Sequence, residues 1–173
     1  GNIKGIIKKL PYIRSLVPEE TTIVLYLTPI TQSPSQNGYD TSDYEKVHEM
    51  FGDWDDVETL VKEAHKCNMR VILDVVFNHS SNENPLLKED PEMYSWIHKY
   101  TKPACWWGYE GLVEFNKDSP RYVEHLKKWL ALYEKYFDGI RLDVADNLPD
   151  FTLKIIRKFF RKFIIGEVWK NAV

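Results

Sequence analysis

Four apolar runs, each preceded by a stretch with helical periodicity, constrain the fold of this chain more than any other feature. The runs are rich in β-branched and aromatic residues, and they span residues 21–29, 70–76, 139–145 and 164–169. Apolar and polar residues do not alternate within them, which is typical of strands that are buried on both faces. The runs therefore predict a parallel sheet that is covered by helices.

The stretches before these runs carry the signals of helix ends. The expected helices span residues 2–16, 52–68, 120 to about 137, and 151–163. Acidic residues open the second helix and Asn68 closes it. Ser119 and Pro120 supply a hydroxyl cap and a proline at the first position of the third helix. Alternating strands and helices of this kind predict a parallel α/β fold, either an open sheet or a barrel.

Two further observations favour the barrel. No glycine-rich phosphate-binding loop follows any of the strands, which removes the commonest reason to choose the open sheet. A complete (β/α)8 barrel takes about 250 residues, and four strands are about half of one. We therefore expect a partial TIM barrel, about strands 2 to 5, in a fragment of a longer protein. The expected division is a barrel part over residues 1–79, an inserted excursion over 80–118 and a second barrel part over 119–173.

The composition excludes several classes of partner. The formal net charge of −3 argues against a nucleic-acid partner, which needs a concentrated basic face. No apolar run approaches the roughly 20 residues that cross a bilayer. Cys67 and Cys105 stand far apart without metal-ligand spacing around either, so we expect two reduced thiols and a cytoplasmic protein rather than a disulfide.

The fourth expected helix has a second interpretation. Lysines and arginines interleave with aromatic residues over 151–163, as in helices that lie on membrane surfaces. Its apolar residues nevertheless follow helical spacing at Phe151, Ile155, Ile156, Phe159 and Phe163. We therefore expect this helix to cover the barrel.

Polar side chains follow three of the four strands, at the sheet edge where α/β proteins place their chemistry. They are Asn78 and His79 after the second strand, Arg141 and Asp143 in the third, and Glu167 in the fourth. Asp143 and Glu167 are separated by 24 residues (167 − 143), one strand–helix–strand unit. Neighbouring strands lie about 4.8 Å apart, which permits two carboxyl groups at the ~5–5.5 Å separation of a retaining glycosidase.

At these motifs the chain resembles the α-amylase family of glycoside hydrolases. GIRLDVADN is similar to the family's motif around the nucleophile, IIGEVW to the motif around the acid/base, and DVVFNH to the motif on the third barrel strand. GYDTSDY followed by FGDWDD is similar to the stretch after the second strand. WWGYEGLVEFN resembles the excursion of the neopullulanase, cyclomaltodextrinase and maltogenic amylase branch, although LVEFN departs from that branch's usual form.

The resemblance implies roles for individual residues. Asp143 would be the nucleophile, and Glu167 would be the acid/base, with a pKa above that of Asp143. Arg141 would keep Asp143 ionised. The remaining implied contacts with substrate come from His79, Tyr39 and Asp40, of which Asp40 would either orient the arginine or line the site. Asn147 and Trp107 are further candidates for substrate contact, and Trp107 could instead close a small core under the excursion.

The resemblance also implies a substrate and leaves alternatives open. The expected substrate is an α-glucan oligosaccharide such as a dextrin or cyclodextrin, and the expected full-length enzyme is a homo-oligomer. We expect no cofactor: the asparagine that matches Asn78 binds calcium in many α-amylases, but structural hydrogen bonding is favoured here. A non-catalytic barrel relative is one alternative. A transglycosylase, isomerase or α-1,6-glucosidase of the same family is another, since Asp146-Asn147 departs from the starch-specific pattern. The family's third carboxylate, after the seventh strand, has no counterpart in this sequence.

Overall fold

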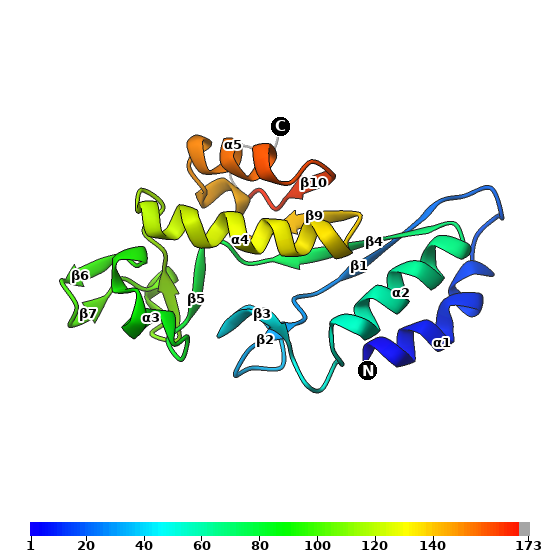
Figure 1. Cartoon of the computed structure of the whole chain (residues 1–173), viewed down its shortest axis with the longest axis horizontal. Helices are drawn as coiled ribbons and strands as arrows, with labels where there is room; N and C mark the ends of the chain where they lie inside the picture. The colour runs from blue at the N-terminus through cyan, green and yellow to red at the C-terminus, as the bar shows by residue number, and fades with distance from the viewer. Residues whose placement is uncertain (170–173) are drawn as a thin grey trace.

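A computed structural model describes residues 1–169 and contains one four-stranded parallel sheet (Figure 1). The strands lie in the order β1-β4-β9-β10. Their bounds are Ile23–Leu27 for β1, Met69–Val75 for β4, Gly139–Leu142 for β9 and Phe163–Gly166 for β10. Each strand matches one of the expected apolar runs, so the parallel α/β fold is confirmed.

Helices connect the strands and lie along the outside of the sheet (Figure 1). The main helices are α1 (Ile3–Arg14), α2 (Trp54–Lys66), α4 (Pro120–Tyr136) and α5 (Asp150–Phe159). The expected signals at α2 are confirmed: Asp53 caps its start by accepting from the backbone N–H of Asp56, and Asn68 has φ 53° just beyond its end. A left-handed residue after the last turn stops a helix because the next amide can no longer continue the hydrogen-bond series.

Two expectations about helix ends are wrong. Ser119 is the N-cap of α4, but its side chain makes no capping hydrogen bond. The start is set instead by Pro120, with its preset φ, and by the Ser119 carbonyl, which accepts from the N–H of Val123. The helix expected over 151–163 ends at Phe159, because Arg157 binds the carbonyls of Arg161 and Lys162 and holds the chain in a turn.

The buried stripe of α5 therefore differs from the expected one. Ile156 and Phe160 are buried, whereas Phe151 and Phe159 are partly exposed and Phe163 belongs to β10. Packing against α4 still makes α5 a covering helix, as expected. Among residues 1–169, no helix combines the length and the apolar composition needed to cross a membrane.

The two faces of the sheet have different surroundings. Alternate residues of β4 and β9, such as Leu73 and Ile140, pack into the core formed with the helices. On the opposite face, Val24 and Tyr26 of β1 and Ile165 of β10 are exposed. The expectation that every strand is buried on both faces is therefore correct for β4 and wrong for β1 and β10, because the described helices cover only one face.

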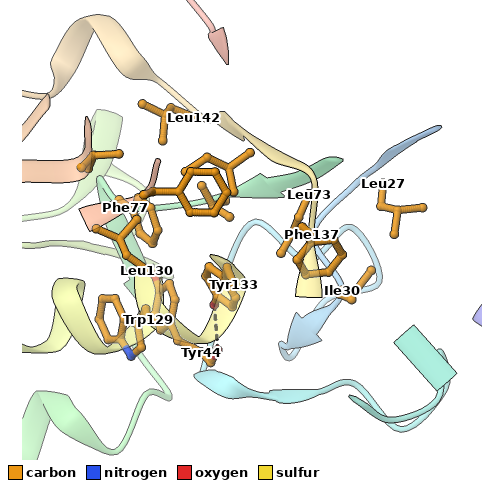
Figure 2. Close-up of a cluster of buried hydrophobic side chains, with 14 of the residues drawn as sticks. Leu27, Ile30, Tyr44, Leu73, Phe77, Trp129, Leu130, Tyr133, Phe137 and Leu142 are labelled. Carbon is orange, nitrogen blue, oxygen red and sulfur yellow. Dashed lines mark hydrogen bonds between the residues drawn. The ribbon is translucent and has the colours of Figure 1, made fainter. Parts of the chain in front are cut away.

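Aromatic side chains form much of this core and also hold the end of β4 (Figure 2). The Tyr44 hydroxyl lies 2.8 Å from the carbonyl oxygens of both Val76 and His79 and shares its one proton between them. The Tyr133 hydroxyl donates to the carbonyl of Tyr44 at 2.7 Å, which is the dashed line in Figure 2. Buried hydroxyl groups need such partners, and here they fix the backbone that carries His79.

Short irregular elements fill the rest of the chain. Between β4 and α4 lie β5 (His79–Ser81), α3 (Leu86–Glu89), η1 (Pro91–Met93), β6 (Trp96–His98), β7 (Lys102–Pro103), η2 (Trp106–Gly108) and β8 (Leu112–Glu114). The short helix η3 (Ala145–Asn147) follows β9. An antiparallel pair that was not foreseen, β2 (Thr31–Gln32) with β3 (Asp43–Val47), precedes α2. The division of the chain at 80–118 remains a prediction.

Candidate active site

Arg141 is the centre of the polar group at the strand ends. It lies on β9 in register with Asp74 of β4, and both side chains point to the sheet face that the helices leave open. Arg141 Nη1 lies 2.9 and 3.0 Å from the Asp74 carboxylate oxygens and 3.0 Å from Asp143 Oδ1, and Nη2 lies 2.8 Å from Glu167 Oε1. One guanidinium therefore binds three carboxylates.

The backbone brings Asp143 and Glu167 together. Asp143 directly follows β9, and its N–H donates to the Val75 carbonyl at 3.0 Å. Val144, the next residue, has φ 48° and ψ 45°, a left-handed conformation that is rare for a β-branched residue. The turn aims the Val144 N–H at Glu167 Oε2, 2.9 Å away. A strained turn thus connects the two expected catalytic carboxylates.

The expected order of the two pKa values is reversed in this structure. Burial raises the pKa of Asp143 to about 7, with the charges of Asp74 and Glu167 adding to the rise and Arg141 opposing it. Burial also raises the pKa of Glu167, but the Val144 N–H, Trp169 and Arg141 outweigh it, and the net pKa is below its ordinary value. The expectation fails because burial of Asp143, together with the charges of Asp74 and Glu167, outweighs the opposing effect of Arg141.

Tyr39 and Asp40 follow a tight glycine turn after β1. Gly38 has φ 81°, and a Cβ there would lie 2.6 Å from the Pro29 carbonyl, so only glycine fits. The Tyr39 hydroxyl donates to Asp74 Oδ2 at 2.8 Å and joins the polar group. Asp40 binds Ser35 instead. Of the two roles expected for Asp40, orienting the arginine is wrong, because Asp74 occupies that position, and lining the site stays a prediction.

Three polar residues form a chain that sets the protonation of His79. The Asn147 amide donates to Asn78 Oδ1 at 2.7 Å, which leaves the Asn78 Nδ2 to donate to His79 Nδ1 at 3.2 Å. His79 then carries its proton on Nε2, which is buried and makes no close hydrogen bond within residues 1–169, although the Tyr39 backbone lies near enough to favour the protonated ring. Burial outweighs this effect and lowers the pKa of His79 to about 4, so the ring is neutral at pH 7 and keeps its Nε2–H as a donor.

A row of aromatic rings extends from His79 to the end of β10. Trp106 stacks on His79 with 6.3 Å between ring centroids, and Trp107 stacks on Trp106 at 5.4 Å. Trp107 is 70% exposed and meets Trp169 edge-on at 6.3 Å. Exposed rings of this kind suit contact with the apolar faces of a ligand. The structure thus brings Trp107 beside the strand that carries Glu167.

Asp74 is the functional residue whose importance the sequence understated. It lies within the second apolar run, and the structure shows that two tyrosines and Arg141 all bind it. Its side chain has no exposed surface. The signal that could have identified it is its register with Arg141, which no single motif contains.

Comparison with known proteins agrees with this geometry. The family model described as alpha amylase, catalytic domain, matches residues 1–106, more than half of the chain. The chain is 33% identical over 99% of its length to an intracellular maltogenic amylase of Bacillus subtilis, and 31% identical over 99% to neopullulanase 2 of Thermoactinomyces vulgaris. It covers 32% of each of these relatives.

The fold is likewise similar to that of solved enzymes. The structure of a debranching enzyme from Nostoc punctiforme superposes with a TM-score of 0.84 and 30% identity over 99% of this chain and 40% of the enzyme. This likeness confirms the expected fold class, part of a (β/α)8 barrel. The matching family model, with relatives aligned over nearly the whole chain, leads to one conclusion: this chain belongs to the alpha-amylase catalytic-domain family.

Proposed function

We propose that the protein is a retaining glycoside hydrolase that cleaves α-glucosidic bonds of dextrins, cyclodextrins or pullulan. The observation that carries this proposal is the contact of one guanidinium with both Asp143 and Glu167. Two carboxyl groups bound to the same guanidinium lie close enough for one to attack the sugar while the other protonates the leaving oxygen. The named relatives, a maltogenic amylase and a neopullulanase, support the substrate class.

In the free site the proton lies on Asp143 rather than on Glu167, so this mechanism requires that it moves to Glu167 when substrate binds. Asp143 then attacks the anomeric carbon, and Glu167 donates that proton to the departing oxygen. Glu167 then takes a proton from the water that releases the sugar. The raised pKa of Asp143 means that the nucleophile of the free site is fully ionised only above about pH 7. Positive charge that develops on the sugar ring beside Asp143 favours its ionised form. The Nε2–H of His79 supplies a donor for a sugar hydroxyl.

The test measures dextrin hydrolysis by the full-length protein and follows the anomeric form of the first product by NMR. Retention of configuration is expected. Glu167→Gln should lower kcat by about 10²- to 10⁴-fold, and Asp143→Asn should abolish turnover. Asp55→Asn and Glu110→Gln change the same side-chain types at exposed positions and serve as matched controls. Absence of turnover in the unmodified protein would favour the non-catalytic relative, and unchanged turnover in both site variants would contradict the catalytic roles of Asp143 and Glu167. Exclusive glucosyl transfer would favour the transglycosylase.

We also propose that Asn78 is a structural residue rather than a calcium ligand. Asn78 is fully buried, and its side-chain oxygen already accepts from Asn147 at 2.7 Å. Within residues 1–169, no group of three or more His, Cys, Asp or Glu side chains is arranged to hold a metal ion. Thermal unfolding with and without a calcium chelator checks this, and a lower Tm in the chelator would contradict it.

A further inference from the structure

A cleft of about 340 Å³ lies between β3, the loop before α3, and α4. It shares no lining residue with the candidate active site. Its lining includes Tyr44 and Trp129, which are buried and stacked with 4.0 Å between ring centroids (Figure 2). Its volume is at the lower end of the range for small-molecule sites, ~300–1,000 Å³.

Asn84 contributes a buried donor without an acceptor. The residue is 3% exposed, and its Oδ1 accepts from the backbone N–H of Leu86 at 3.0 Å. This bond fixes the orientation of the amide, because the oxygen must face the N–H. Among residues 1–169, the Nδ2 then has no hydrogen-bond partner. A buried donor left unpaired is costly and calls for a partner from outside the chain.

His125 contributes an unpaired acceptor to the same cleft. Its Nε2 lies 3.2 Å from Asp90 Oδ2, and its Nδ1 is buried without a partner. When Nε2–H donates to the carboxylate, Nδ1 carries a lone pair and accepts. The residues that line the cleft therefore include one unmatched donor and one unmatched acceptor. A ligand that carries hydroxyl groups offers both the acceptor and the donor that these atoms lack.

The charges around the cleft exclude other ligand classes. Asp43, Glu45 and Glu89 line it and oppose an anion, and the one lysine, Lys128, is paired with Glu45 at 2.8 Å. A cation would leave the Asn84 N–H unpaired. We infer that the cleft is a second, non-catalytic binding site for a neutral polyhydroxylated ligand about the size of one sugar ring.

Titration of the isotopically labelled full chain with glucose tests this inference by NMR. Saturable shifts are expected for the Asn84 side-chain amide and the His125 ring. Asn84→Asp keeps the oxygen that accepts from Leu86 but removes the Nδ2 donor, and should weaken binding about tenfold, the effect of one hydrogen bond. Asn82→Asp makes the same change at an exposed position of the same loop and should leave binding unchanged.

Several outcomes would overturn the inference. Glucose that shifts only His79 would bind the strand-end site alone, and no shift at His125 would mean that water fills the cleft. Equal affinity in the Asn84→Asp and Asn82→Asp proteins would show that the free amide takes no part. The titration of the unmodified chain decides the question even if a variant does not fold. None of these results depends on whether the protein hydrolyses dextrins.

Discussion

The two faces of the sheet are built from alternate residues of the same strands, yet they are stabilised in different ways. The helix-covered face carries residues such as Leu73, which is 1% exposed among other apolar side chains. The open face carries Asp74 next along the chain, held by Arg141 and two tyrosines. Residues of β4 are therefore buried in two different environments: close apolar packing on one face, and a network of paired charges on the other.

The largest expected effect comes from removing the cation of the open face. Arg141→Gln leaves Asp74 buried without an ion partner and should lower the free energy of unfolding at pH 7 by about 3–5 kcal/mol. Urea unfolding measures this. Arg121→Gln removes an arginine that pairs with Asp90 at the surface, and should lower the free energy of unfolding far less, because solvent screens this pair. Equal losses in the two variants would remove the distinction between a buried network and a surface pair.

Removing side-chain volume should destabilise the protein on the helix-covered face of the sheet but not on the open face. Leu73→Ala creates a cavity in the core and should lower the free energy of unfolding by about 2–5 kcal/mol. Val24→Ala, on the open face of β1 at 53% exposure, should change it by about 0.5 kcal/mol or less. The two urea midpoints compare them directly. A large loss in Val24→Ala would mean that the open face is covered.

The open face should also give stability a dependence on pH. The pKa of Asp143 is about 7 when folded and ordinarily 3.8, so between these values the folded state binds more protons than the unfolded state. Asp143 therefore stabilises the folded state below about pH 4. This contribution to the free energy of unfolding, on the order of 1 to 4 kcal/mol, is lost as the pH rises through 7. Asp143→Asn should remove this part of the slope in unfolding measured from pH 4 to 8. An unchanged slope would contradict the assignment to Asp143.

The smallest expected effect concerns a single hydrogen bond of the network. Tyr26→Phe removes the hydroxyl that donates to Asp74 but keeps the ring, and should cost about 1 kcal/mol. Tyr12→Phe changes an exposed tyrosine of α1 and serves as the control. If both variants unfold at the same urea concentration, Tyr39 and Arg141 alone satisfy Asp74.

The sequence by itself determined the elements and the residue types at the strand ends. The four strands, the helices between them, and the positions of Asp143 and Glu167 could all be predicted, because each depends on signals within about 20 residues. Two helix ends were not predicted correctly: the length of α5 and the cap of α4 depend on hydrogen bonds that only the folded chain shows.

Only the tertiary structure decided which of these residues share a partner. The register of β4 with β9 places Asp74, rather than Asp40, against Arg141. Burial of Asp143 and the hydrogen bond from the Val144 N–H to Glu167 reverse the expected pKa order of these two acids. The reason is physical: electrostatic interactions depend on distances and burial across the whole site, and no spacing along the chain specifies either.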